Sequence, residues 1–173
     1  SNTFIQIILL SLIWMGVIGF LDDYLKVIKK FEKGLIAKYK LIGQITLGII
    51  ISLWIYNAPE YQGITSSSSI PFLKNYEIDF GLFYPLIIIL VITGASNAVN
   101  LTDGLDGLAA GLLAISFSVF SAIAYISGRV DFSSYLNILY LPGAGELTVF
   151  TAAITGACIG YLWFNASPAE VFM

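Results

Sequence analysis

Histidine is absent from the 173 residues, and only one cysteine, Cys158, is present. The lack of histidine removes the usual general base and the commonest metal ligand, so acid, base or metal chemistry must depend mainly on carboxylates. A single cysteine excludes a disulfide framework within the chain. Charge is also scarce, because charged residues make up 11% of the sequence, whereas a soluble domain contains about 25%. With 58% hydrophobic residues, the composition indicates a membrane protein.

Five long apolar runs account for most of the chain. They cover residues 4–21, 41–56, 82–99, 108–127 and 147–164. Crossing the hydrocarbon core of a bilayer takes about 20 helical residues, and the runs are continuous, unlike the alternating segments of a transmembrane barrel. We therefore predict an all-α integral membrane protein, a polytopic bundle with five transmembrane helices in one membrane domain over residues 1–173.

The first run does not have the features of a signal peptide. No basic segment precedes it, no small-residue cleavage site follows it, and the acidic pair of DDYLK comes directly after it. The chain also starts without methionine and stops at EVFM within a polar flank. We therefore expect it to be a piece of a longer protein.

The basic residues predict the orientation of the helices. Six of the eight lysines and arginines lie between the first two runs: Lys26, Lys29, Lys30, Lys33, Lys38 and Lys40. By the positive-inside rule, the loop 22–40 is cytoplasmic. Alternation then places 97–107 and 165–173 on the cytoplasmic side as well, and the N-terminus, 57–81 and 128–146 outside. The outer loop 57–81, with its serine tract at 66–69, has room for a short hairpin.

Adjacent acidic residues end the first run, in the string GFLDDYLKVIKK. A solvated helix end is the simplest interpretation, and the lysines could serve only topology or binding of anionic lipid. Negative charge at a helix C-terminus, however, opposes the helix dipole. Asp22 and Asp23 therefore need a compensating partner, either a cation or the neighbouring lysines.

A second polar cluster, NAVNLTDGLDG, separates the third and fourth runs. Asn97, Asn100, Asp103 and Asp106 recur every three residues, which keeps neighbours close on a helical or 3₁₀ turn. The two Asp-Gly pairs are also typical of turns and helix caps, but one such residue is enough for a cap. Oxygen-rich groups are what Mg²⁺ prefers, usually one or two carboxylates with substrate phosphates.

The third polar element, FNASP, ends the last run with Asn165. Taken alone it is a helix end with a turn. In the predicted topology, however, all three elements emerge on the cytoplasmic side. Four aspartates at one level favour a site for a divalent cation and phosphate. Gln44, within the second run, is expected either to hydrogen-bond between helices or to belong to this site.

Four strings, GFLDDYLKVIKK, KYKLIGQ, NAVNLTDGLDGLAAG and LWFNASPAEVFM, resemble in that order the phospho-N-acetylmuramoyl-pentapeptide transferase family. This family is a branch of the polyprenyl-phosphate N-acetylhexosamine-1-phosphate transferases. The resemblance implies about ten transmembrane helices, of which this chain holds the central part. It also implies transfer of phospho-MurNAc-pentapeptide from UDP to undecaprenyl phosphate, with Mg²⁺ as cofactor, giving lipid I and UMP for peptidoglycan synthesis.

The resemblance further implies a bacterial inner membrane protein with a cytoplasmic active site, contact with membrane lipid, a homodimer and no nucleic-acid partner. In the family, a segment with the principal metal-binding aspartate and then a histidine-rich loop follow the position of Met173. We therefore expect part of the metal site and of the donor site to lie outside these 173 residues.

The family's functional residues carry over to matching positions. Asp22, Asp23 and Asp103 are the expected catalytic residues, with Asp22 deprotonating or orienting the lipid phosphate. The expected metal ligands are Asp103 and Asp22. The expected substrate-binding residues, which include lysines that neutralise phosphate and groups near the uridine, are Lys26, Lys40, Asn97, Asn100, Gly104, Leu105, Asp106, Asn165 and Phe172.

Three alternatives stay open. The nearest is a sibling transferase that uses UDP-GlcNAc or another UDP-hexosamine. An intramembrane prenyltransferase is less favoured, because its Asp-rich motifs typically use a spacing of four. A transporter or channel would place charges along an ion path in mid-membrane, whereas here the charges cluster at helix ends.

Overall fold

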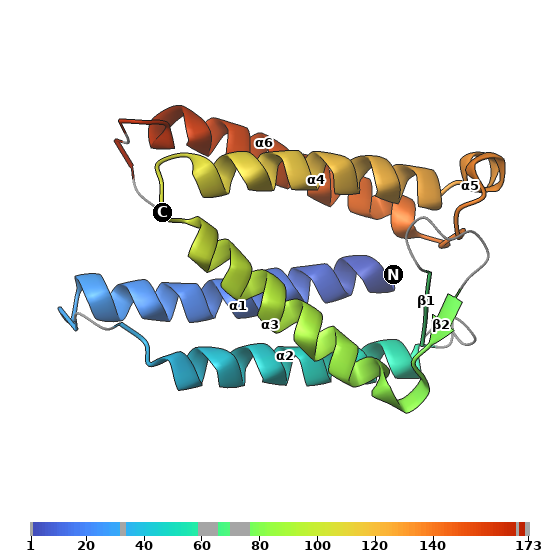
Figure 1. Ribbon diagram of the computed structural model, residues 1–173, viewed down its shortest axis with the longest axis horizontal. Helices are drawn as coiled ribbons and strands as arrows, with labels where there is room; N and C mark the ends of the chain where they lie inside the picture. The colour runs from blue at the N-terminus through green and yellow to red at the C-terminus, as the bar shows by residue number, and fades with distance from the viewer. Residues whose placement is uncertain (1, 32–33, 59–65, 70–76, 169, 172–173) are drawn as a thin grey trace. The chain divides into compact units, whose positions relative to one another are not determined.

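Five long helices form the chain in the computed structural model, which describes residues 2–31, 34–58, 66–69, 77–168 and 170–171 (Figure 1). They are α1 (Thr3–Val27), α2 (Ala37–Asn57), α3 (Tyr84–Thr102), α4 (Leu108–Ser127) and α6 (Leu147–Asn165). Each is long and apolar enough to cross a membrane. The predicted all-α polytopic fold is thus confirmed for the described part of the chain.

The helices extend beyond the apolar runs where polar side chains continue the helical spacing. Helix α1 continues past residue 21 to Val27, and an ion pair between Asp22 and Lys26, four residues apart, supports this last part. Helix α3 continues to Thr102. As a result, Asn97 and Asn100 are helical, although hydropathy alone places them at the start of a loop.

The shorter elements lie in the connections between the long helices. Strands β1 (Ser67–Ser69) and β2 (Glu77–Asp79) pair antiparallel, with Ser68 opposite Ile78, which confirms the hairpin expected in 57–81. The Asp79 carboxylate accepts hydrogen bonds from the Ser66 hydroxyl and the Gly81 amide. These bonds lower the pKa of Asp79, and the bond from Ser66 is the main cause. The described residues also form two 3₁₀ turns, η2 (Gly81–Phe83) and η3 (Ala144–Glu146), and the short helix α5 (Val130–Leu136).

The chain divides into two compact units. Residues 7–96 form what we call the α1–α2 unit, with most of α1, all of α2, the hairpin and the first part of α3. Residues 1–6 and 97–173 form the α4–α6 unit, with the end of α3, α4, α5 and α6.

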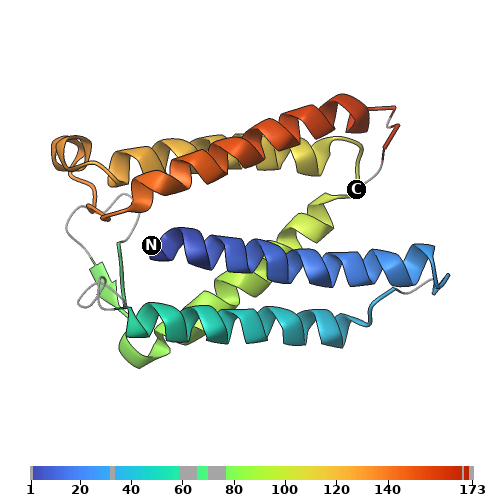
Figure 2. The ribbon, with the colours of Figure 1, turned by 180° about the vertical axis from the view of Figure 1, so that it is seen from behind.

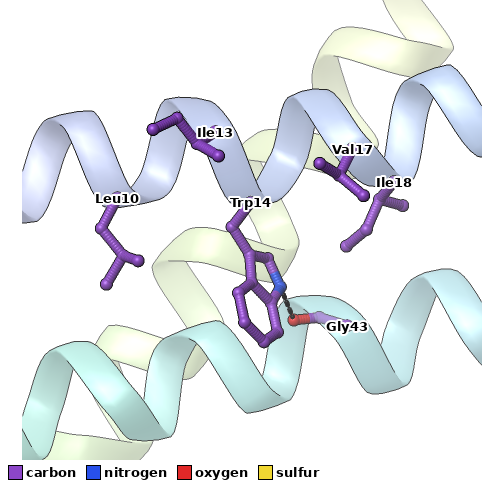
Figure 3. A pocket seen from close by; sticks show the side chains of 6 residues that line it. All are labelled: Leu10, Ile13, Trp14, Val17, Ile18 and Gly43. Atoms are coloured by element: carbon purple, nitrogen blue, oxygen red, sulfur yellow. Dashed lines mark hydrogen bonds between the residues drawn. The ribbon is translucent and has the colours of Figure 1, made fainter.

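Close packing in the α1–α2 unit depends on small residues of α2. The indole Nε1 of Trp14 on α1 donates to the carbonyl oxygen of Gly43, at 3.0 Å (Figure 3). A Cβ atom at Gly48 would lie 3.0 Å from the Cα atom of Ile89 on α3. Between these contacts, Gln44 donates to the Ser96 hydroxyl at 2.9 Å. Gln44 is therefore an interhelical hydrogen-bond donor, one of the two roles expected for it.

In the α4–α6 unit, helices α4 and α6 lie side by side along their lengths (Figures 1 and 2). Ala109, Ala110 and Ala114 on α4 are buried, as expected where small residues let helix backbones approach. The Asn2 side chain donates to the carbonyl oxygen of Gly143 at 2.7 Å. Residue 2 and the 128–146 connection therefore lie at the same end of this unit, consistent with the same side of the membrane being predicted for both.

Candidate functional site

A buried carboxylate joins the end of α1 to the start of α2. The Oδ2 atom of Asp22 accepts hydrogen bonds from the ammonium groups of Lys26, at 2.8 Å, and Lys40, at 2.7 Å. Its Oδ1 atom accepts the backbone amide of Leu35 at 2.7 Å. We call Asp22, Lys26, Leu35 and Lys40 the Asp22 cluster. Both carboxylate oxygens thus have donors, as a buried carboxylate requires.

Gly34 allows the backbone to approach the carboxylate. Its φ angle is +57°, in the left-handed region that favours glycine. A Cβ atom at this position would lie 2.5 Å from Oδ1 of Asp22, closer than side-chain atoms can pack. Glycine is therefore needed at this position for two reasons, its backbone conformation and the space beside Asp22.

The Asp22 cluster carries one carboxylate and two ammonium groups, so its formal charge is positive. The Asp22 side chain is only 10% exposed, whereas those of Lys26 and Lys40 are 47% and 31% exposed. The lysines can therefore reach an incoming anion while Asp22 holds them in place. Asp23 is exposed and lies outside the cluster. This arrangement is suited to binding a phosphate group.

The second group of predicted residues lies on the end of α3 and the turn before α4. Asn97 and Asn100 are exposed on the last two turns of α3, and Asp103, Gly104, Leu105 and Asp106 are exposed on the turn itself. The turn is closed by the Leu108 amide, which donates to the carbonyl oxygen of Leu105 at 3.0 Å. It ends at Gly107, whose φ angle is +76°. We call residues 103–107 the Gly107 turn.

Asn165 ties the Gly107 turn to the end of α6. Its Oδ1 atom accepts the amide of Gly107 at 3.1 Å, and its Nδ2 atom donates to the carbonyl oxygen of Val171 at 2.8 Å. Asn165 is 4% exposed. Its amide group therefore positions the turn and the segment after α6, and a contact of Asn165 with substrate stays a prediction.

Tyr161 was not identified from the sequence. It lies one helical turn before Asn165 on α6, and its hydroxyl group is buried without a hydrogen-bond partner in the part of the chain that the structure describes. A tyrosine within an apolar run gives no signal in the sequence, because its surroundings depend on how α6 packs.

The predicted residues thus fall into two groups. The α1–α2 unit brings Asp22, Lys26 and Lys40 together, and the α4–α6 unit contains Asn165 and the predicted residues from Asn97 to Asp106. Phe172 lies outside the described residues. Among the described residues, no three Asp, Glu or Cys side chains form a group that could hold a metal ion. The catalytic, substrate-binding and metal-binding roles of these residues stay predictions.

Comparison with known proteins gives a family match over nearly the whole chain. The family model described as glycosyl transferase family 4 matches residues 5–173. A phospho-N-acetylmuramoyl-pentapeptide-transferase of Chloroherpeton thalassium is 51% identical over 173 residues, which is 100% of this chain and 47% of that protein. Proteins of the same name from Chlorobaculum parvum and Chlorobium phaeovibrioides are each 50% identical, over 98% and 100% of this chain and 46% and 47% of their own lengths. The chain thus spans about half the length of these curated relatives.

Proposed function

The chain belongs to glycosyl transferase family 4, and on that premise we propose that it is the central part of a phospho-N-acetylmuramoyl-pentapeptide transferase. The full protein would transfer phospho-MurNAc-pentapeptide from UDP-MurNAc-pentapeptide to undecaprenyl phosphate. The products would be lipid I and UMP, in the bacterial inner membrane with the active site on the cytoplasmic side. The observation that carries the proposal is 51% identity over all 173 residues to a relative of that name.

The reaction exchanges one phosphorus–oxygen bond for another. An oxygen of the lipid phosphate attacks the β-phosphorus of the donor, the atom that carries the sugar. The bond from that phosphorus to the bridging oxygen breaks, and UMP leaves with the electron pair. No oxidant or reductant is needed. The groups required are cations that bind the two phosphates and a carboxylate that orients the acceptor.

The Asp22 cluster is suited to the acceptor side of this reaction. The ammonium groups of Lys26 and Lys40 are part-exposed and would attract the lipid phosphate. Asp22 is held within 2.8 Å of both ammonium groups, so a phosphate bound by the lysines would lie beside its carboxylate. Asp22 can then orient the attacking oxygen, whereas the two ammonium groups bonded to its carboxylate make it a weak base. Asp23, exposed one residue later, is the second carboxylate that we assign to this step.

The Gly107 turn is suited to the nucleotide side and to Mg²⁺. Asp103 is exposed on the Gly107 turn. With Asp106 it supplies the one or two carboxylates that Mg²⁺ typically takes beside substrate phosphates. The oxygens of Asp22 already accept three hydrogen bonds, so Asp22 could bind the ion only by exchanging one of them. When bound, Mg²⁺ would neutralise the charge that develops on the pyrophosphate.

The remaining predicted residues would bind the uridine part of the donor. Gly104 and Leu105 are exposed at the tip of the Gly107 turn, and Asn97 and Asn100 are exposed on α3 beside it. Asn165 would act by holding the turn. A homodimer and the position of Phe172 near the uridine remain parts of the proposal that rest on the family resemblance.

UMP release by a protein of the relatives' full length, containing this chain, tests the proposal. We expect release that requires Mg²⁺, undecaprenyl phosphate and UDP-MurNAc-pentapeptide together. Asp22→Asn and Asp103→Asn should each lower the rate by about 10²- to 10⁴-fold. The control, Asp131→Asn, changes an exposed carboxylate in α5 and should leave the rate unchanged. Release from UDP-GlcNAc alone would instead favour the sibling transferase, and no release from either donor would contradict the proposal.

A further inference from the structure

Exposed apolar side chains gather on α5 and on the loop that follows it, outside the five long helices. Their exposed fractions range from 40% to 86%, and they are Phe132, Tyr135 and Leu136 on α5 with Ile138, Leu139 and Tyr140 after it. We call these six side chains the α5 patch. A loop in water rarely presents so many apolar groups together, and such a patch marks contact with another protein or with a membrane.

The α5 patch lies at one end of α4. Helix α4 has 20 residues and is therefore about 30 Å long, so α5 is at the opposite end of α4 from the Gly107 turn. The amide of Leu141 donates to the carbonyl oxygen of Ser127 at 2.9 Å, and a Cβ atom at Gly128 would overlap the backbone of Gly145. The connection thus returns to the end of α4. Because α4 is long and apolar enough to cross a membrane, the connection stays at the level of one membrane surface.

Helix α5 lies across the direction of α4 and α6. It is seen nearly end-on in Figures 1 and 2, whereas α4 and α6 run across both views. A helix in this orientation, at the end of membrane-crossing helices, runs along the membrane surface. At 3.6 residues per turn, Phe132, Tyr135 and Leu136 fall within about 100° of one another. Asp131 and Ser134 lie outside that arc, so α5 has an apolar side.

The α5 patch is joined to the exposed surface of α4. The ring centroid of Phe132 lies 5.9 Å from that of Tyr125, on the last turn of α4, and Tyr125 is 44% exposed. Tyrosine is enriched where the hydrocarbon region of a membrane meets water. With Tyr135 and Tyr140, the patch and its junction with α4 contain three such residues, as expected for a surface at that boundary.

The charges beside the α5 patch are paired. Arg129 and Asp131 are the only charged residues in 129–140, and they lie 3.2 Å apart. The guanidinium carbon of Arg129 also lies 5.5 Å and 5.3 Å from the ring centroids of Tyr125 and Phe132. Contact with aromatic faces stabilises a cation that leaves bulk water. A segment without net charge does not attract a charged protein partner, so the observations favour the lipid surface.

We propose that the α5 patch inserts into the headgroup region of the membrane leaflet on the side opposite to the Gly107 turn. The partner is the lipid surface, bound through apolar and tyrosine contacts and not through the charge of a headgroup. Inserted in this way, α5 holds the adjoining ends of α4 and α6 at a fixed depth. The inference goes beyond the proposed function and does not depend on it.

Spin labels on α5 test the proposal in the full-length protein in nanodiscs. Tyr135→Cys carries the label in the patch, and Ser134→Cys carries it outside the apolar arc, with Cys158 and any other cysteine replaced by alanine. Collisions with oxygen, which concentrates in lipid, and with a water-soluble nickel chelate report the surroundings of each label. We expect a higher ratio of oxygen to nickel collisions at Tyr135 than at Ser134. Leu139→Cys, in the loop, should repeat the result for Tyr135 and serves if that variant does not fold.

Two outcomes of the labelling would overturn the proposal. Frequent nickel collisions at both patch positions would show that the patch lies in water. Few collisions with either reagent would show that another segment of the protein or a second copy covers the patch.

A change of lipid and a matched pair of substitutions test the nature of the contact. Because the contact is apolar, nanodiscs of phosphatidylcholine and of phosphatidylglycerol should give the same ratio at Leu139. Tyr135→Asp should lower that ratio, whereas Ser134→Asp, which adds the same charge outside the arc, should not. Insertion only into the acidic lipid, or equal effects of the two substitutions, would contradict an apolar seat in the membrane surface.

Discussion

The Nζ atom of Lys40, at the start of α2, lies 2.7 Å from Oδ2 of Asp22, near the end of α1. This ion pair joins two residues that are 18 positions apart, and the same oxygen binds Lys26. The pair fixes the ends of two membrane-crossing helices to each other. It also holds two cations beside one carboxylate, the arrangement on which the proposed acceptor site depends.

Asp22→Asn should lower stability, because it removes the charge between two ammonium groups. Hydrogen bonds to charged groups contribute about 1.5–3 kcal/mol each, and Asp22 is buried, so we expect a loss of about 2 kcal/mol in the free energy of unfolding. Asp23→Asn changes an exposed neighbour and should stay within about 0.5 kcal/mol. Thermal unfolding in detergent measures both, and equal shifts for the two variants would contradict the structural role of Asp22.

Alanine substitutions at two glycines with positive φ angles separate two effects. One effect is strain in the backbone, and the other is displacement of the Asp22 carboxylate. Gly34 has φ +57° and no space for a Cβ atom beside Asp22, whereas Gly81 has φ +48° and, among the described residues other than its chain neighbours, no atom within 4 Å of an added Cβ. Alanine at either position should cost about 1–2 kcal/mol through its left-handed backbone. Gly34→Ala alone should also lower the rate of UMP release, because it displaces the carboxylate. If Gly34→Ala leaves the rate of UMP release unchanged, the predicted displacement of the carboxylate is contradicted.

Asn165→Ala should release the Gly107 turn. The substitution leaves the Gly107 amide and the Val171 carbonyl oxygen without their partner, which should cost about 1–3 kcal/mol. Faster hydrogen exchange at the Gly107 amide and a higher KM for the UDP-linked donor are the expected readouts. Asn57→Ala, at an exposed residue that donates to the Leu53 carbonyl oxygen of its own helix, is the control. Unchanged exchange at Gly107 would contradict the bridging role.

Tyr161→Phe should not destabilise the fold. The hydroxyl group of Tyr161 is buried without a hydrogen-bond partner among the described residues, and such a group opposes folding. Its removal should leave the free energy of unfolding unchanged or raise it by up to about 1 kcal/mol. Thr148→Val tests a second hydroxyl in the same situation. A marked loss of stability in Tyr161→Phe would mean that the hydroxyl group has a partner in the full-length protein.

The membrane class and the five helices could be predicted from the sequence because each helix coincides with a long apolar run. The pair of Asp22 with Lys26 is also visible in the sequence, since residues four apart on a helix are neighbours. The hairpin could be anticipated from its place in a polar connection with a serine tract. These features depend on spacing within a short segment.

Contacts between distant segments could not be predicted in the same way. Lys40 reaches Asp22 only because the chain turns back at Gly34, and nothing in the spacing distinguishes Lys40 from Lys38. The bond between Asn165 and Gly107 joins residues 58 positions apart and depends on the packing of α4 against α6. The hydrogen bond from Trp14 to Gly43 likewise depends on how α1 packs against α2, which hydropathy does not encode.

The identity of the transferred group distinguishes the proposed function from its alternatives. The most direct measurement is a competition assay in which the full-length protein receives Mg²⁺, undecaprenyl phosphate and equal amounts of UDP-MurNAc-pentapeptide and UDP-GlcNAc, followed by mass spectrometry of the lipid fraction. We predict undecaprenyl pyrophosphate carrying MurNAc-pentapeptide, formed about 10²- to 10⁴-fold more slowly by the Asp22→Asn variant. A lipid product carrying only GlcNAc, or no lipid-linked sugar at all, would contradict this prediction.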